Sequence, residues 1–266
     1  MRVVVVPCLR DNYAYLVVGD DPGAALVVDP SEAAPVEEAL SREKLRLAGV
    51  LATHHHPDHT GGIAQLVKGR SVPVVASAID GAKFGGVTRE IGDGETFAIG
   101  GVTLEARFVP GHTLGAVAFV VRENGAPKAV FTGDTMFVAG CGRLFEGTPA
   151  DMHRSLNARI ATLPDDVLVH CGHEYTEANL RFAAHVEPSN EAVREAIERA
   201  RTKRANGEAT VPSTIGEEKR INPYLRCGEP TVRAFVGATD ASSDVDVLAR
   251  VRAAKDAWGV GAKGGK

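Results

Sequence analysis

The sequence holds few cysteines and no long apolar run. Its four cysteines, Cys8, Cys141, Cys171 and Cys227, form no Cys-x-x-Cys pair among 266 residues. This scarcity argues against a disulfide framework and against a zinc knuckle built from thiolates. The longest apolar runs, such as residues 117–121, fall far short of the roughly 20 residues that cross a bilayer. We therefore expect no association with a membrane.

An excess of charge of either sign is also lacking. The 30 Lys and Arg residues and 34 Asp and Glu residues leave a net charge of −4, without a long basic run. Nucleic-acid binding is therefore not expected as the main activity. The apolar stretch at the N-terminus is cut short by Pro7, so we expect no secretory signal and predict a cytoplasmic protein.

Short β-branched runs alternate with Gly, Asp and Pro turns up to about residue 170. This order of strands and helices predicts an α/β sandwich. Helices are expected at 33–46, 63–68 and 151–162. Strands are expected at 3–6, 13–18, 26–29, 49–53, 72–76, 102–109, 115–121, 129–132 and 167–170.

Helical spacing replaces the strand pattern in the last third of the chain. Val193, Ile197 and Ala200 recur at helical intervals between charged residues, and residues 243–258 are expected to form a final helix. We predict two domains, an α/β domain over 1–173 and a smaller helical domain over 174–266.

Histidines are concentrated in one short segment. Thr53-His54-His55-His56-Pro57-Asp58-His59 follows a predicted strand and precedes a predicted helix. Imidazole nitrogen and carboxylate oxygen both suit zinc, iron and manganese. In extended backbone His54 and His56 point the same way, whereas Asp58 and His59 lie beyond the bend at Pro57. This geometry favours two neighbouring metal ions over one.

Three isolated residues could complete the two coordination shells. His112 lies in a glycine-bounded turn, Asp134 follows a strand, and His173 ends another strand. Taken alone, each has an ordinary explanation as a loop or turn residue. Given the histidine cluster, each becomes a candidate ligand. His55, His153, His170 and His185 are expected to be ordinary structural or surface residues.

Several motifs together resemble a known family. Thr-His-His-His-Pro-Asp-His is followed by Pro-Gly-His-Thr, Thr-Gly-Asp-Thr and Gly-His-Glu-Tyr, which is similar to the metallo-β-lactamase superfamily. Asp11-Asn12-Tyr13, the Cys-Gly-Arg segment at 141–143 and Asn222-Pro223-Tyr224 make glyoxalase II, the hydroxyacylglutathione hydrolases, the closer match. The resemblance covers essentially the whole chain.

The resemblance implies a fold and a metal site. The fold would be a metallo-β-lactamase αβ/βα four-layer sandwich with a smaller C-terminal helical domain, which would bind glutathione. The site would hold two divalent metal ions, zinc first, with iron or manganese as alternatives. The first ion would be held by His54, His56 and His112, the second by Asp58, His59 and His173, and Asp134 would bridge them.

The implied activity is thioester hydrolysis. S-D-lactoylglutathione and other 2-hydroxyacylglutathiones would be cleaved to glutathione and an acid, D-lactate for the first, as the second step of methylglyoxal detoxification. A hydroxide held between the metals would attack, with Asp58 both ligating and hydrogen-bonding to it. Arg143, Tyr175, Arg252 and Lys255 would bind the glutathione carrier, and we expect a monomer.

Two residues depart from the family pattern. Arg143 stands where several members carry Lys, and Phe145 stands where they carry Tyr. Arginine keeps a cation with a different geometry, whereas phenylalanine lacks a hydroxyl that could bond to the carrier. These departures leave open whether the carrier is glutathione or another low-molecular-weight thiol.

Other functions are kept as alternatives. Another hydrolase of this fold, such as a lactonase or phosphodiesterase, or a persulfide dioxygenase could act on a different conjugate. A dioxygenase would need one redox-active iron, and the availability of both Asp58 and His59 favours a second metal. A β-lactamase is less expected, because those enzymes commonly replace the bridging Asp by Cys. A metal-stabilised interaction or nucleic-acid-binding protein would need a basic stripe that the charge balance does not support.

Overall fold

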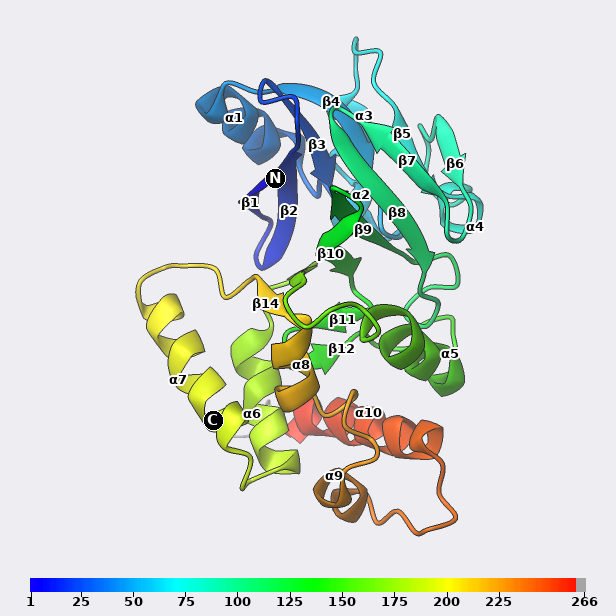
Figure 1. Ribbon diagram of the computed structural model, residues 1–266, viewed down its shortest axis with the longest axis vertical. Helices are drawn as coiled ribbons and strands as arrows, with labels where there is room; N and C mark the ends of the chain where they lie inside the picture. The colour runs from blue at the N-terminus through cyan, green and yellow to red at the C-terminus, as the bar shows by residue number, and fades with distance from the viewer. Residues whose placement is uncertain (262–266) are drawn as a thin grey trace.

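Two facing sheets form the centre of the molecule (Figure 1). The computed structural model describes residues 1–261, and over that range it contains two six-stranded sheets. In the first sheet the neighbouring strands are, in order, β1 (Arg2–Cys8), β2 (Asn12–Val18), β3 (Ala24–Val28), β4 (Arg46–Leu51), β5 (Val74–Ser77) and β6 (Arg89–Ile91). In the second they are β14 (Ser213–Thr214), β13 (Leu168–Cys171), β10 (Ala126–Gly133), β9 (Val117–Glu123), β8 (Val102–Phe108) and β7 (Thr96–Ile99). A two-stranded hairpin, β11 (Met136–Phe137) and β12 (Gly140–Cys141), follows β10.

The central strands of the sheets, such as β2 and β3, are buried on both faces, which explains their apolar sequences. Successive side chains of a strand point to opposite faces. In β2, Tyr15 packs in the apolar layer between the sheets, and Leu16 packs in the layer on the outer face of the first sheet. A third apolar layer, with Val120 and Leu156, covers the outer face of the second sheet. Strands buried on both faces carry near-continuous apolar runs, as β2 and β3 do.

Helices form the outer layers. The first sheet is covered by α1 (Ala33–Glu43) and α3 (Ile63–Leu66), with the short helices α2 (Pro57–Thr60) and α4 (Ala78–Gly81) at strand ends. On the second sheet lie α5 (Pro149–Arg154) and its continuation as a π-helix, η1 (Ser155–Ile160). The result is the four-layer αβ/βα sandwich that the family resemblance implies.

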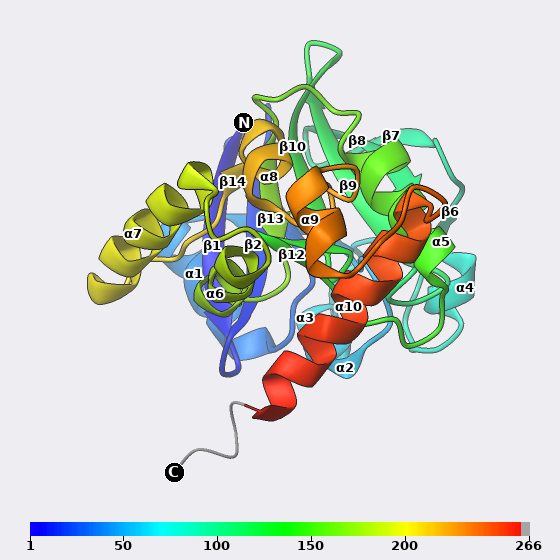
Figure 2. The ribbon, with the colours of Figure 1, turned by 90° about the horizontal axis from the view of Figure 1, so that it is seen from below.

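The C-terminal segment is helical apart from the edge strand β14. Its helices are α6 (Thr176–Val186), α7 (Glu191–Ala205), α8 (Ile215–Ile221), α9 (Pro230–Phe235) and α10 (Asp244–Gly261). They gather at one end of the sheets in Figure 1, and α10 packs against α5 (Figure 2). Residues 262–266 of the expected helical domain lie outside the described residues. Among the described helices none has the length and apolar character needed to cross a membrane.

Most expected elements are present, with shifted ends. The helix expected to reach residue 46 ends at Glu43, because Lys44 adopts the left-handed conformation (φ 56°) and Arg46 starts β4. The pattern gives no separate range for α6 or α9 within the predicted helical domain, and the other elements that it misses are short: β6, β7, the β11–β12 hairpin, β14, α2 and α4. One of them matters for the metal site, because α2 carries Asp58 and His59.

Candidate metal centre and its pocket

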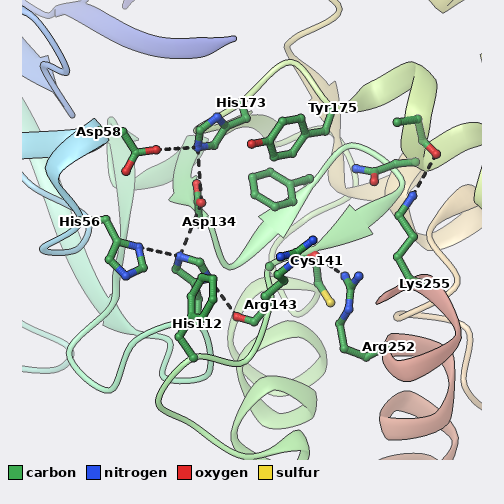
Figure 3. Close-up of a pocket in the computed structure, with 15 residues that line it drawn as sticks. His56, Asp58, His112, Asp134, Cys141, Arg143, His173, Tyr175, Arg252 and Lys255 are labelled. Carbon is green, nitrogen blue, oxygen red and sulfur yellow. Dashed lines mark hydrogen bonds and ion pairs between the residues drawn. The ribbon is translucent and has the colours of Figure 1, made fainter. Parts of the chain in front are cut away.

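The candidate ligands come from loops at the ends of strands in both sheets. His54 and His56 follow β4, and Pro57 starts α2 at a position where its missing N–H costs nothing. His112 lies in the loop between β8 and β9. Asp134 follows β10 and His173 follows β13, two parallel neighbours in the second sheet. The segments therefore meet where strands of both sheets end, and Figure 3 shows His56, Asp58, His112, Asp134 and His173 close together there.

Three imidazoles form the first cluster. His56 Nδ1 lies 3.0 Å from His54 Nε2 and 3.0 Å from His112 Nε2. Burial lowers the pKa of all three side chains, which favours the neutral imidazole that binds metals. The lone pairs of neutral imidazole nitrogens repel one another at about 3 Å, so a proton or a metal cation must lie between the nitrogens.

The second cluster combines two imidazoles with a carboxylate. His59 Nε2 lies 3.3 Å from His173 Nε2, and Asp58 Oδ2 lies 3.4 Å from His173 Nε2 and 3.8 Å from His59 Nε2. Burial opposes the charged form of His173, but hydrogen bonds with Asp134 and Asp58 outweigh it and raise its pKa to about 10. The second cluster thus contains a carboxylate, which the first cluster lacks.

Asp134 lies between the two clusters. Its Oδ1 is 3.2 Å from His59 Nε2, and its Oδ2 is 3.5 Å from His112 Nε2. Asp134 is only 8% exposed, and over residues 1–261 Oδ1 accepts no hydrogen bond of good geometry. A buried carboxylate oxygen without a partner is costly, and a bound cation would satisfy it. Nitrogen separations of 3.0–3.3 Å are compatible with metal–nitrogen bonds of about 2.0–2.1 Å. The donor set fits a dimetal site.

Outer partners orient four of the five imidazoles. His59 Nδ1 is 3.0 Å from Asp29 Oδ2, and His173 Nδ1 is 2.9 Å from Asp11 Oδ1. His54 Nδ1 lies 3.1 Å from Thr53 Oγ1, and His112 Nδ1 lies 2.9 Å from the Arg143 carbonyl oxygen. Such contacts set the tautomer and direct the other nitrogen toward a metal. Asp29 and Thr53 were not predicted as site residues, although Asp29 directly follows the buried strand β3.

A cavity of about 490 Å³ opens over the clusters and extends toward α10. One end is lined by five of the candidate ligands: His56, Asp58, His112, Asp134 and His173. The other end is lined by all four predicted carrier residues: Arg143, Tyr175, Arg252 and Lys255. The cavity therefore joins a metal end to a cationic end.

The carrier residues differ in how firmly they are held. Arg252 is 8% exposed, and its Nη1 donates to the Cys141 carbonyl oxygen at 2.9 Å. Lys255 donates to the Ala178 carbonyl oxygen at 2.9 Å, and burial lowers its pKa to about 8. The Tyr175 ring stacks on His173 with centroids 4.7 Å apart. Arg143 is largely exposed, with Asp256 Oδ1 3.7 Å from its Nε.

Comparison with known proteins shows the family. Residues 9–173 match the family model described as metallo-beta-lactamase superfamily, and residues 174–258 match the model described as hydroxyacylglutathione hydrolase C-terminus. The chain belongs to the hydroxyacylglutathione hydrolase family of the metallo-β-lactamase superfamily.

Full-length relatives agree with these two matches. A hydroxyacylglutathione hydrolase of Methylococcus capsulatus is 44% identical over 97% of this chain and 99% of its own length. A hydroxyacylglutathione hydrolase from a Synechococcus strain is 45% identical over 96% of this chain and 99% of its own length. Among solved structures, BLEG-1 B3 metallo-beta-lactamase has a TM-score of 0.64 at 22% identity, covering 84% of this chain and 99% of that one. These values confirm the predicted family and fold.

The structure brings the residues predicted from the family pattern to one place. The seven candidate ligands converge at the metal end, and the four carrier residues line the same cavity. Their individual roles stay predictions. The other histidines behave as expected where they are buried: His170 is 2% exposed, stacks on Phe131, and has its pKa lowered to about 4 by burial. It is a core residue of this hydroxyacylglutathione hydrolase family member.

Proposed function

We propose that this chain hydrolyses S-D-lactoylglutathione and other 2-hydroxyacylglutathiones to glutathione and the free acid. The observation that carries the proposal is the single cavity that joins a His/Asp metal end to an Arg/Lys end. A thioester of an anionic peptide needs both, because one end must activate the carbonyl and the other must bind carboxylates. Relatives that match almost the whole chain bear the name hydroxyacylglutathione hydrolase.

The metal ligands are proposed residue by residue. His54, His56 and His112 would hold one ion, Asp58, His59 and His173 the other, and Asp134 would contact both. When bound, the ions would supply a Lewis acid for the carbonyl oxygen and lower the pKa of water. Zinc is the first choice for a His/Asp donor set, with iron or manganese as alternatives.

Asp58 is the protein group that we assign to the attacking water. Its side chain is 41% exposed and faces the cavity. A hydrogen bond with His173 lowers the pKa of Asp58, so the carboxylate is ionised and acts only as an acceptor. Asn12 Nδ2 donates to Asp58 Oδ2 at 3.2 Å and to its backbone oxygen at 2.9 Å, which orients the carboxylate. Asp58 can thus accept a hydrogen bond from the attacking water and orient the lone pair of that water toward the thioester.

No dedicated acid is needed for the leaving group. A thiol has a pKa of about 8.5, so a thiolate departs readily near neutral pH. The task of the carrier end is therefore binding rather than proton transfer. We propose that Arg143, Arg252 and Lys255 bind the carboxylates of glutathione and that Tyr175 contacts its peptide portion.

We also propose two domains, 1–173 for catalysis and 174–266 for the carrier. The division is supported by the distribution of the site: the candidate ligands all lie before residue 174, whereas Tyr175, Arg252 and Lys255 lie after it. A cytoplasmic location and a monomeric state remain predictions.

The test is hydrolysis of S-D-lactoylglutathione, followed by loss of thioester absorbance, with metal content assayed on the same sample. Rapid turnover with close to two metals per chain would support the proposal. Two metals without turnover would contradict the substrate and retain the dimetal site. One iron per chain with oxygen consumption in the presence of a persulfide would instead favour a dioxygenase.

A further inference from the structure

A buried carboxylate outside the ligand set connects two of the metal-binding loops. Asp80 lies on α4, directly after β5, and is 1% exposed. It contacts no candidate carrier residue and is absent from the lining of the cavity over the metal clusters. Its position raises the question of what a charged group does there, since buried carboxylates are rare unless hydrogen-bonded or paired.

Three hydrogen bonds to Asp80 come from two separate loops. Oδ2 accepts from the backbone N–H of His55 at 3.1 Å and from Thr113 Oγ1 at 2.7 Å. Oδ1 accepts from the backbone N–H of Gly115 at 3.1 Å. His55 lies between the candidate ligands His54 and His56, and Thr113 directly follows the candidate ligand His112. One carboxylate therefore fixes the spacing of the two loops that carry the first cluster.

The surrounding chain is shaped to bring Asp80 this close. Ser77 Oγ accepts from the backbone N–H of Asp80 at 3.2 Å and donates to the Gly115 carbonyl oxygen at 2.6 Å. A Cβ atom at Gly115 would lie 2.4 Å from Asp80 Oδ1, which is impossible without displacing the carboxylate. Glycine at 115 is thus required by the approach of Asp80.

The two clusters differ in what holds their imidazoles. In the second cluster Asp29 and Asp11 contact the outer nitrogens of His59 and His173 directly. In the first cluster the outer nitrogens of His54 and His112 meet only a hydroxyl and a carbonyl oxygen. The orientation of the first cluster therefore depends more on the position of its loops than on a carboxylate held against each ring.

We propose that Asp80 is the positioning residue of the first metal cluster, and that it acts by joining the 54–56 loop to the 112–115 loop. It replaces, for the first cluster, the direct carboxylate–imidazole contacts of the second. The inference rests on the proposed function only through the dimetal site, and it makes no assumption about the substrate.

The test is stepwise binding of Co²⁺ to the metal-free protein, followed by visible absorbance and by equilibrium dialysis. We expect Asp80→Asn to weaken the binding of one ion ten- to a hundredfold, the usual effect of losing an outer partner, and to leave the other ion unchanged. Asp11→Asn, which alters the contact with His173, should also weaken the binding of one ion. The double variant should weaken the binding of both ions.

Two controls separate positioning from general destabilisation. Glu187 is a carboxylate with 4% exposure that bonds to Arg226 and Thr231 away from the metal end. Glu187→Gln should lower the temperature of thermal unfolding and leave both Co²⁺ affinities unchanged. If Asp80→Asn does not fold, Thr113→Val and Thr113→Ser form a matched pair. Thr113→Val should weaken the binding of one Co²⁺ ion, whereas Thr113→Ser, which keeps the hydroxyl, should bind both ions as the wild type does.

Equal affinities for both ions in Asp80→Asn and in wild type would overturn this inference alone. A comparable loss at both ions would also overturn it, because that result indicates a structural role. Wild-type protein that binds fewer than two ions would overturn the dimetal site and this inference together.

Discussion

The two ends of the cavity are built on different principles. At the metal end most of the side chains are buried and fixed by partners: His54 and His59 are each 1% exposed, and His59 is held by Asp29. At the carrier end the Arg143 side chain is 68% exposed and Tyr175 is 36% exposed, whereas Arg252 is 8% exposed. Ordered ligands suit a reaction that depends on the geometry of a few atoms, whereas half-exposed side chains suit a flexible peptide that must enter and leave.

This difference predicts how each end responds to substitution. Loss of one ligand at the metal end leaves other buried donors unsatisfied, so its effect should be large and should appear in kcat. Loss of one contact at the carrier end can be compensated by water or by a neighbouring cation, so its effect should be smaller and should appear in KM.

The largest expected effect is that of His59→Ala. The variant removes a buried donor that lies within 3.3 Å of both His173 and Asp134. We expect it to lower metal content and to reduce turnover about 10³-fold or more, since a metal ion contributes several kcal/mol to the transition state. Metal analysis and kinetics measure these two properties, and circular dichroism checks the expectation that the fold is retained. His185→Ala, on α6 and outside the cavity lining, is the control, and normal metal content with normal activity in His59→Ala would contradict the proposed second site.

A middle-sized effect is expected for Lys255→Met. The variant loses the proposed bond between Lys255 and a carboxylate of glutathione. A hydrogen bond to a charged group contributes about 1.5–3 kcal/mol, so KM should rise roughly tenfold or more with little change in kcat. A change in kcat without a change in KM would break the comparison between the two ends.

The pH dependence sharpens the same prediction. Burial lowers the pKa of Lys255 to about 8, so the free enzyme carries this cation below pH 8 and loses it as the pH rises through that value. We expect kcat/KM of wild type to fall above pH 8 for this reason. Lys255→Arg, which stays charged, should remove the fall, and Lys255→Met should show low, pH-independent binding across the window. A persistent fall in Lys255→Arg would assign it to another group.

The sequence predicts the metal end better than the partners that hold it. Four donors within the segment His54 to His59 have no ordinary structural explanation, so the segment predicts a metal site without knowledge of the fold. Asp29 and Asp80 resemble turn formers after strands. Their partners lie 30 residues away for the Asp29–His59 contact and 33 for the Asp80–Thr113 bond, and only the fold brings them together.

The same reasoning applies to the elements of the fold. Long buried strands such as β2 and β8 were predictable, because their apolar or alternating patterns extend over seven residues each. The two-residue strands β11, β12 and β14 are defined by pairing with a neighbour, which no local pattern contains. The carrier end needed the family resemblance, since Arg252 and Lys255 alone would pass for a charged helix face.

The smallest expected effect, and the finest test of the comparison, is that of Phe145→Tyr. The Phe145 ring lies beside the metal end, with its centroid 5.6 Å from that of His56 and 5.2 Å from that of His112, yet it is 62% exposed. A hydroxyl added there can bond to the bound carrier without disturbing the core. One hydrogen bond contributes about 0.5–1.5 kcal/mol, so KM for S-D-lactoylglutathione should fall about 2- to 10-fold, with kcat and metal content unchanged. Phe145→Leu, which adds no hydroxyl, is the matched control. A lower kcat in Phe145→Tyr would place this residue functionally with the metal end, whereas an unchanged KM would indicate that the carrier of this enzyme does not reach position 145.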